Sequence, residues 1–334
     1  MAVFGHKEFH DHERVVYGYH KESGLRAIIS IHNSNLGPAL GGCRMIPYVN
    51  DDDALTDVLR LSRGMTYKAA MAKVPYGGGK AVILGDPTKD KTEALLCAMG
   101  RFIHSFGGEY ISGEDMNISV ADCKVMARET LHIGGIAETP TGGDPSPMTA
   151  YGVEMAIRAA LFHRYHTNSL TGKKIHVEGN GKVGPPLAEG LVAAGAEVFV
   201  TDINIERERK AVADLGVISV SNDFLTSYDE LDVYAPCALG KAVNDENVGK
   251  ITAKIVCGAA NNILENPENG ETLKERGIVY VPDYVANCGG LIDIYYQNTG
   301  YDVEKAHAHT KSVAYDMTLK ILSAARNLNC TTLF

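Results

Sequence analysis

Apolar positions in the first 130 residues predict a sheet flanked by helices. Residues 14–19 (RVVYGY) and 25–32 (LRAIISIH) are typical of two strands. A helix is expected at about 52–72, where five side chains fall on one face: Leu55, Val58, Leu59, Ser62 and Met65. The pattern then predicts a strand at 80–84, a helix at 90–106, a strand at 108–112 and a helix at 119–129.

Beyond residue 148, strands and helices alternate more regularly. A helix at about 149–165 precedes the strand KKIHVEG, and a helix from about 182 precedes the strand AEVFVTD. After a helix near 204–215 come the strands LDVYAP, AKIVCG and IVYVPD, and a final helix at about 303–328. Such alternation is typical of a parallel sheet with helices on both faces, so the sequence predicts the α/β class.

A length of 334 residues exceeds what one hydrophobic core usually organises, which favours two domains. The Pro- and Gly-rich stretch 139–148, TPTGGDPSPM, is the clearest linker. We therefore place the first domain at 1–138 and the second at 139–325, with a last segment at 326–334.

Composition excludes several classes of function. A net charge of -9 argues against a general nucleic-acid or membrane-surface binder, which would present a basic face. Seven cysteines without a CxxC pair indicate reduced thiols rather than a disulfide framework. Because no signal layout or membrane-spanning apolar run is present, we expect a cytoplasmic protein. His6, His10, His12 and Glu13 can be arranged as a metal site, but a solvated N-terminal segment is favoured and no metal is expected.

The hexapeptide GNGKVG, residues 179–184, matches the GxGxxG pattern of dinucleotide-binding proteins. It follows a predicted strand and opens a predicted helix, which is the context the pattern requires. Its residues are Gly179, Asn180, Gly181, Lys182, Val183 and Gly184. The glycines permit a tight turn, a close approach of the backbone to a pyrophosphate, and tight packing of helix on strand. Asp202 ends the next strand, where it would accept hydrogen bonds from ribose hydroxyls and repel a 2′-phosphate, so NAD is expected rather than NADP.

A second glycine-rich stretch, GGGKAVIL at 77–84, does not fit a phosphate-binding P-loop. The first glycine of that motif would fall on Val74, and Lys80 is followed by Ala81 rather than Ser or Thr. We interpret these glycines as space for substrate or cofactor, and Lys80 as a partly desolvated lysine suited to act as a general base. Lys68, if it stays charged, would suit a carboxylate, whereas Lys73 is expected on the surface.

Eight motifs occur in order over nearly the whole chain: LGPALGGCRM, RLSRGMTYKAAMA, GGGKAVI, GEDMN, PSPMTAYG, YAPCALG, GAANN and PDYVANCGG. Together they resemble the glutamate/leucine/phenylalanine/valine dehydrogenase family. The resemblance implies an N-terminal substrate and oligomerisation domain, a C-terminal Rossmann domain that binds NAD, and a segment from residue 326 that returns towards the first domain. It also implies a homo-oligomer, from dimer to octamer.

The family's reaction would be NAD-dependent reversible oxidative deamination of an L-amino acid to a 2-oxo acid and ammonia. The resemblance implies that Lys68 binds the substrate carboxylate, Lys80 activates water as a base, and Asp115 exchanges protons with the substrate nitrogen. Asn262 would hold bound substrate or cofactor, and Thr149 would contact the nicotinamide. Further residues implied near substrate are Gly41 and Gly42, and those implied near cofactor are Cys237, Ala238, Ala260 and Asn261.

Four positions would line the pocket for the substrate side chain: Leu40, Gly113, Leu291 and Ile294. All are apolar or lack a side chain, which disfavours glutamate as the substrate. Branched aliphatic amino acids such as leucine are favoured, with phenylalanine or tryptophan as the alternative. A protein that binds NAD without catalysis is the alternative from another class, but it would have no chemical reason to hold Lys68, Lys80 and Asp115 together. A hydroxy-acid or shikimate-type dehydrogenase would need a different proton-transfer group.

Overall fold

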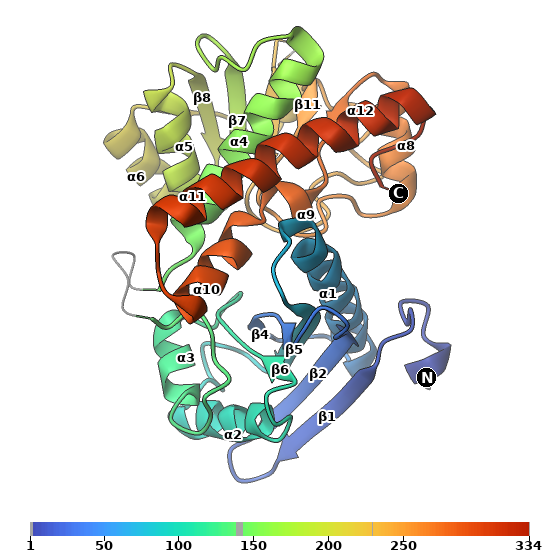
Figure 1. Cartoon of the computed structure of the whole chain (residues 1–334). Coiled ribbons are helices and arrows are strands. Elements are labelled where there is room, and N and C mark those ends of the chain that lie inside the picture. The colour runs from blue at the N-terminus through green and yellow to red at the C-terminus, as the bar shows by residue number, and fades with distance from the viewer. Residues whose placement is uncertain (1–2, 138–142, 229, 334) are drawn as a thin grey trace. The chain divides into compact units, whose positions relative to one another are not determined.

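The computed structural model describes residues 3–137, 143–228 and 230–333. The chain forms two compact units, each described here by itself (Figure 1). The N-terminal unit comprises Met1–Asp144 and Ile294–Tyr301, and the C-terminal unit comprises Pro145–Asp293 and Asp302–Phe334. The expected linker at 139–148 falls partly outside the described residues.

A mixed sheet forms the centre of the N-terminal unit. Its strands are β1 (Arg14–His20), β2 (Leu25–Asn33), β3 (Ala39–Leu40), β4 (Cys43–Ile46), β5 (Gly77–Leu84) and β6 (Tyr110–Ile111). The order is β1-β2-β5-β3-β6, and β4 also pairs with β5. The contacts from β1 to β2 and from β2 to β5 are antiparallel, whereas β3, β4 and β6 join in parallel. The predicted strands at 14–19, 25–32 and 80–84 are confirmed, and the short strands β3 and β4 were not predicted.

Helices pack on both faces of this sheet. They are α1 (Asp51–Ala72), α2 (Glu93–His104) and α3 (Val120–Met126), preceded by the short η1 (Val3–Gly5). The start of α1 is fixed by the Asn50 side chain, which accepts the Asp53 N–H, and by acidic residues in the first turn. One face of the sheet buries Ile28 and Val82 against α1, while the other packs against α2 and α3.

The triple glycine begins β5, three residues before the predicted start, for reasons of packing. A side chain at Gly78 would collide with Thr66 of α1, and one at Gly79 would meet the ring of Tyr110. A side chain at Gly77 would collide with the backbone of Asn33. Protein atoms therefore fill the space beside all three residues, and the expectation that these glycines leave room for substrate or cofactor is wrong.

The C-terminal unit contains a parallel sheet of six strands. They are β7 (Lys174–Glu178), β8 (Glu197–Thr201), β9 (Ile218–Ser219), β10 (Val233–Pro236), β11 (Ile255–Val256) and β12 (Val279–Tyr280). The order is β12-β11-β10-β7-β8-β9, with every pair parallel. From β7 the chain continues to β8 and β9 on one side of the sheet. It then crosses back to β10, which pairs with the other edge of β7, and continues to β11 and β12. This is the doubly wound Rossmann order, and it confirms the predicted fold class.

The helices of this unit pack on both faces of the parallel sheet (Figure 1). The helices of the unit are α4 (Ser146–Tyr165), α5 (Gly184–Ala193), α6 (Ile205–Leu215), α7 (Phe224–Ser227), α8 (Pro267–Glu275), α9 (Asp283–Ala286), α10 (Gly289–Thr299), α11 (Val303–Lys311) and α12 (Thr318–Leu328), of which α11 and α12 pack on α4. The single helix predicted at 303–328 is instead divided by a π-helical segment, Ser312–Met317. The residues of α10 are shared between the two units.

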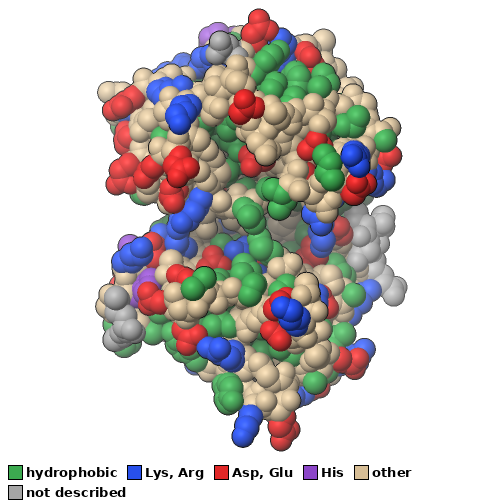
Figure 2. Space-filling view, turned by 180° about the vertical axis from the view of Figure 1, so that it is seen from behind, with side chains coloured by type: hydrophobic (Ala, Val, Ile, Leu, Met, Phe, Trp, Pro, Cys, Tyr) green, Lys and Arg blue, Asp and Glu red, His purple; other side chains and the backbone are tan. Residues whose placement is uncertain are grey.

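Acidic and basic side chains are interspersed within each unit on the face shown in Figure 2. All seven cysteines are free thiols, and four of them are buried: Cys43, Cys123, Cys257 and Cys288. Among the described residues, no helix combines the length and the apolar character needed to cross a membrane.

Candidate active site

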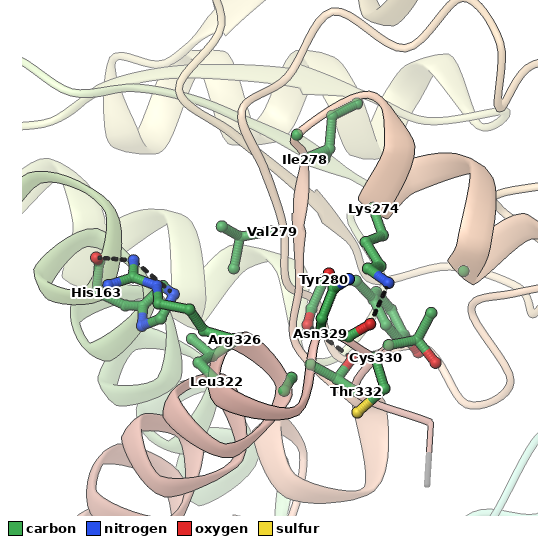
Figure 3. A pocket seen from close by; sticks show the side chains of 14 residues that line it. His163, Lys274, Ile278, Val279, Tyr280, Leu322, Arg326, Asn329, Cys330 and Thr332 are labelled. Atoms are coloured by element: carbon green, nitrogen blue, oxygen red, sulfur yellow. Dashed lines mark hydrogen bonds between the residues drawn. The ribbon is translucent and has the colours of Figure 1, made fainter.

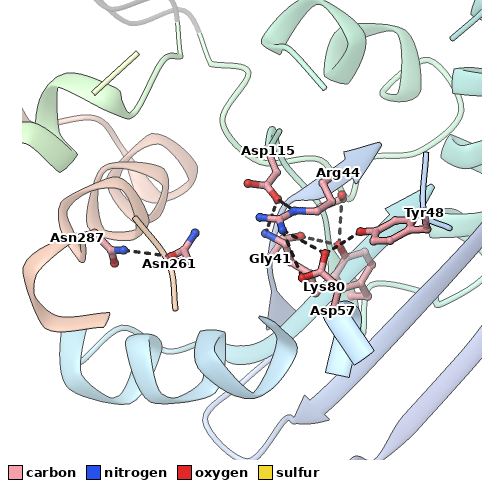
Figure 4. Close-up of polar contacts among 10 residues, drawn as sticks. Gly41, Arg44, Tyr48, Asp57, Lys80, Asp115, Asn261 and Asn287 are labelled. Atoms are coloured by element: carbon pink, nitrogen blue, oxygen red, sulfur yellow. Dashed lines mark hydrogen bonds and ion pairs between the residues drawn. The ribbon is translucent and has the colours of Figure 1, made fainter. Parts of the chain in front are cut away.

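Lys80 and Asp115 form the centre of a buried polar cluster in the N-terminal unit (Figure 4). Nζ of Lys80 lies 2.9 Å from Oδ2 of Asp115, and the Lys80 side chain is only 5% exposed. Lys80 lies two residues before Val82 in β5, so both side chains point to the face of the sheet that α1 covers. The predicted catalytic pair is therefore brought together, although the two residues are far apart in the sequence.

The loop that carries Asp115 is fixed by backbone hydrogen bonds. The Ile118 N–H donates to the Asp115 carbonyl at 2.9 Å, which closes a tight turn. On the other side, the Met45 N–H of β4 donates to the Met116 carbonyl, and the Asn117 side chain donates to the Met45 carbonyl. These contacts hold the carboxylate beside β4 and β5.

Three further polar side chains complete the cluster, and none of them was singled out from the sequence. Arg44 Nε donates to Asp115 Oδ2 at 2.7 Å, and Arg44 Nη1 lies 3.1 Å from Asp57 Oδ2. The Tyr48 hydroxyl donates to the same Asp57 oxygen at 2.7 Å. Arg44 lies opposite Val82 in the parallel pairing of β4 with β5, which directs its side chain to the same face as Lys80.

The two cations decide the charge of Asp115. Burial by itself would raise the pKa of this carboxyl, but the charges of Lys80 and Arg44 and their hydrogen bonds outweigh it. They hold the pKa of Asp115 well below its usual range. Asp115 is therefore an anion at neutral pH.

Gly41 and Gly42 allow the loop after β3 to approach this cluster closely. A side chain at Gly41 would collide with the Gly79 carbonyl, and one at Gly42 would collide with the Glu114 carbonyl and meet Cβ of Asp115. The Gly41 carbonyl also accepts a hydrogen bond from the Tyr110 hydroxyl. Both glycines thus border the predicted catalytic pair.

The other lysines of this region differ in exposure. Lys68 lies on α1 and is half-buried. Lys73 is exposed and ends α1 in the left-handed conformation, with φ of 53°. The prediction that Lys73 is a surface residue is confirmed.

Three of the predicted pocket residues belong to the N-terminal unit. Leu40 is buried in β3. A side chain at Gly113 would meet the Gly134 carbonyl at 3.3 Å, and one at Gly134 would meet Ile294 at 3.1 Å. Gly113 and Ile294 are therefore both neighbours of Gly134. Leu291 is buried in the C-terminal unit.

The GNGKVG loop joins β7 to α5 at the switch point of the parallel sheet, as the motif predicted. Gly179 has φ of 101°, and a side chain there would meet Ala238 at 2.7 Å. A side chain at Gly184 would collide with the Gly179 carbonyl, whereas one at Gly181 would meet nothing within 4 Å. The first and last glycines thus serve close packing, and the middle one leaves the open backbone that a pyrophosphate needs.

Asp202 is tied to this loop at the end of β8. Its Oδ2 accepts the Asn180 N–H at 2.5 Å, and its Oδ1 accepts the Asn204 N–H at 2.7 Å. Glu208 of α6 accepts the Asp202 N–H at 3.0 Å, so a second carboxylate lies at the end of β8. The side-chain Oδ1 of Asn180 is buried, and no group in the described parts of the chain donates to it. These features fit a dinucleotide-binding site.

The remaining predicted cofactor residues follow β10 and β11 in the same unit. Cys237 comes directly after β10, next to β7, and Ala238 contacts Gly179. Burial raises the pKa of the Cys237 thiol to about 12, which agrees with a packing role. The Ala260 N–H donates to the Pro236 carbonyl, so the GAANN turn is held against the end of β10.

Asn261 and Asn262 belong to this turn, and Asn262 has φ of 52°. The Asn287 amide, which was not predicted from the sequence, donates to Asn261 Oδ1 at 3.1 Å and to the Ala259 carbonyl at 3.0 Å (Figure 4). Thr149, near the start of α4, donates to the Pro145 carbonyl and would contact a side chain at Gly290.

A separate cavity of about 400 Å³ lies in the C-terminal unit between α8, α12 and the free edge of β12 (Figure 3). Arg326 donates to His163 across one end of it, and Lys274 donates to the Asn329 carbonyl at the other. None of the predicted site residues lines this cavity.

Two of the histidines near the N-terminus contact α1. His6 and His12 are buried, contrary to the expectation of a solvated segment, because they contact Thr56 and the Leu59 carbonyl of α1. Within the described residues, no group of three or more His, Cys, Asp or Glu is arranged to hold a metal ion.

Comparison with known proteins assigns both units to one family. Residues 12–132 match the family model described as "Glu/Leu/Phe/Val dehydrogenase, dimerisation domain". Residues 200–328 match the model described as "Glutamate/Leucine/Phenylalanine/Valine dehydrogenase".

Individual relatives align over nearly the whole chain. Leucine dehydrogenase of Thermoactinomyces intermedius is 44% identical, with 98% of this chain and 89% of the relative covered. Valine dehydrogenase of Streptomyces albus is 45% identical, with 96% and 89% covered. The crystal structure of L-tryptophan dehydrogenase from Nostoc punctiforme has a TM-score of 0.79 and 40% identity, with 96% of this chain and 92% of that chain covered.

Proposed function

Because the chain belongs to the glutamate/leucine/phenylalanine/valine dehydrogenase family and is an amino-acid dehydrogenase, we propose that it catalyses the NAD-dependent, reversible oxidative deamination of branched aliphatic L-amino acids. The products would be the 2-oxo acid, ammonia and NADH. The observation that carries this proposal is the buried contact between Lys80 and Asp115, which joins a proton donor and acceptor in one cluster with Arg44.

Three residues have separate tasks in the proposed reaction. Lys68 binds the substrate carboxylate, which fixes the orientation of the α-carbon. Asp115 exchanges a proton with the substrate nitrogen. After hydride leaves the α-carbon, Lys80, having given up its own proton, accepts one from the water that attacks the resulting imine. Return of that proton to the nitrogen then lets ammonia depart. Burial of Lys80 supports this role because it excludes competing bulk water from the reacting atoms.

The C-terminal unit would bind the dinucleotide at its switch point. When bound, the nicotinamide supplies the hydride acceptor. The backbone of Gly181 and the N-terminus of α5 would face the pyrophosphate, and Asp202 would accept the ribose hydroxyls. Asp202 and Glu208 lie side by side at the end of β8, and two carboxylates there would disfavour the 2′-phosphate of NADP, which supports NAD as the cofactor.

Leucine or valine is the favoured substrate class. Relatives that carry the names leucine and valine dehydrogenase are 44–46% identical to this chain. The pocket candidates Leu40, Leu291 and Ile294 are aliphatic, and no cation stands among them to bind a second carboxylate. Aromatic substrates are the second candidate because a relative named L-tryptophan dehydrogenase is 42% identical and Gly113 offers extra space.

The N-terminal unit would also carry the contacts of a homo-oligomer. Residues 12–132 match a family model described as a dimerisation domain, which supports assembly of at least two copies. Light scattering at increasing protein concentration measures the mass of the assembly directly. A monomer at all concentrations would contradict this part of the proposal.

Steady-state NADH formation across L-amino acids tests the substrate class. We expect kcat/KM to be highest for leucine and valine, with glutamate poorest, and with NAD preferred over NADP. A maximum at phenylalanine or tryptophan would replace aliphatic by aromatic selectivity. Activity on none of these amino acids would contradict the proposed function as a whole.

A further inference from the structure

We propose that Arg44 is a positioning residue for the proton-transfer carboxylate Asp115: it keeps that carboxylate charged and fixes which of its two oxygens faces the substrate. This inference rests on the proposed function, because it concerns the same proton transfer. Arg44 lies in the motif LGPALGGCRM, but the resemblance assigned it no role, so its contacts in the structure carry the argument.

Arg44 and Lys80 both contact the same oxygen of Asp115. Arg44 Nε lies 2.7 Å from Oδ2, and Lys80 Nζ lies 2.9 Å from the same oxygen. Figure 4 shows the other oxygen, Oδ1, turned away from both cations. In the described parts of the chain, no group donates a hydrogen bond to Oδ1. Because both donors hold one oxygen, the other is left to exchange a proton with the substrate nitrogen.

Arg44 is itself fixed by contacts with two carboxylates. Its guanidinium binds Asp57 through Nη1 while Nε binds Asp115, so one planar group joins two carboxylates. The Tyr48 hydroxyl donates to Asp57 from the other side. The Arg44 side chain is 11% exposed and that of Asp57 is 25% exposed, so solvent screens these charges only in part. A lysine could not make both contacts in this geometry, because an ammonium lacks the planar fork.

The positive charge of Arg44 also affects the protonation of Asp115. Arg44 supplies the second of two cations that keep the pKa of Asp115 low. Two other titratable groups close to Asp115 are Cys43 and Tyr110, and burial raises the pKa of each, so they stay uncharged. Asp122 lies further away, where it caps α3 and pairs with Lys91. Without Arg44, Lys80 would be the sole cation paired with Asp115, and the pKa of the carboxyl would rise.

The test is the pH dependence of kcat for Arg44→Met, which removes the charge and keeps most of the side-chain volume. We expect kcat to fall about 10- to 100-fold, as for loss of a charge-assisted hydrogen bond. We also expect the acidic limb of the kcat profile to move to higher pH, because Asp115 then takes up a proton more readily. A purely structural role for Arg44 would lower kcat without moving this limb.

Two further variants make the result decisive. Arg44→Lys keeps the positive charge but lacks the planar guanidinium. The acidic limb of its pH profile should therefore lie closer to that of the wild type, while kcat stays reduced. This variant also provides the test if Arg44→Met does not fold. Arg26→Met is the matched control, because Arg26 lies in the same sheet, on β2, and its only ion pair in the described residues is the exposed one with Asp51. Its profile should match the wild type.

The outcomes separate this inference from the function on which it rests. An active wild type with an unmoved acidic limb in Arg44→Met overturns the positioning role alone. A wild type that forms no NADH from any amino acid overturns the proposed function, and the inference with it.

Discussion

At the scale of single residues, Lys80 has the role that is most easily isolated by mutation. Lys80→Ala should lower kcat about 10²- to 10⁴-fold, the usual cost of losing a general base. The KM for the amino acid should change far less, because Lys68 rather than Lys80 is assigned to the substrate carboxylate. Steady-state kinetics with the preferred amino acid measures both quantities.

Lys73→Asn is the control for this experiment. Lys73 is exposed and has φ of 53°, a conformation that asparagine tolerates. It should keep the kcat of the wild type. An unchanged kcat in Lys80→Ala would remove the base from the mechanism.

Asp202 is the residue assigned to cofactor choice. Asp202→Asn removes the negative charge that would face a 2′-phosphate but keeps a side chain able to accept a backbone N–H. The ratio of kcat/KM for NAD to that for NADP should fall by about tenfold or more, because repulsion between like charges costs several kcal/mol. Asp214→Asn, at an exposed position of α6 paired with Lys210, should leave the ratio unchanged. Equal ratios for Asp202→Asn and the wild type would assign cofactor choice to other residues.

At the scale of secondary-structure elements, the packing of α1 on β5 depends on glycine. Gly78→Ala would force its methyl group into Thr66 of α1, so the free energy of unfolding should fall by about 1–3 kcal/mol. Gly64→Ala is the matched control within α1, since a side chain there meets nothing within 4 Å. It should raise stability by up to about 1 kcal/mol, because alanine favours helix. Urea unfolding of both variants checks the prediction, and equal effects of the two changes would contradict it.

The sequence predicted those elements whose signals are local. Periodic apolar residues marked α1, and the GNGKVG pattern marked the turn from β7 to α5. The triple glycine was misinterpreted because the collisions that require it come from Asn33, Thr66 and Tyr110, none of them adjacent in sequence. Local patterns also did not reveal the π-helical segment 312–317, whose Val313 and Ala314 are buried like the apolar residues of the flanking helices.

The candidate site was predictable in the same limited way. Lys80 and Asp115 were assigned through motifs that resemble a known family, and the structure brings them into contact. Arg44 was missed although it lies in one of those motifs, because its partners are 13 and 71 residues away along the chain. A lone charged residue in a short strand gives no local sign of what it binds.

At the scale of the whole molecule, one buried histidine should make stability depend on pH. His176 of β7 is packed between Phe224 and Tyr234, and burial lowers its pKa to about 4. Between that value and the ordinary pKa of about 6.5, the unfolded chain binds a proton that the folded chain does not. The contribution of neutral His176 to the free energy of unfolding, up to about 3 kcal/mol, is therefore fully present above about pH 6.5. It is lost as the pH falls towards 4.

His176→Phe should remove the part of this pH dependence that comes from His176. Between about pH 7 and pH 4.5, the free energy of unfolding of the C-terminal unit should fall more in the wild type than in the variant. Urea unfolding at each pH measures this difference. His20→Phe, at an exposed position of β1, should behave like the wild type. Parallel losses in the wild type and His176→Phe would show that other groups account for the acid sensitivity.

The proposed function of the whole molecule requires that hydride transfer and loss of the amino group occur together. The most direct measurement is the ratio of NADH to ammonia formed from L-leucine and NAD by the purified wild-type protein. We predict equal amounts of NADH, ammonia and the 2-oxo acid. NADH without ammonia, or no NADH from leucine or any other L-amino acid, would contradict oxidative deamination.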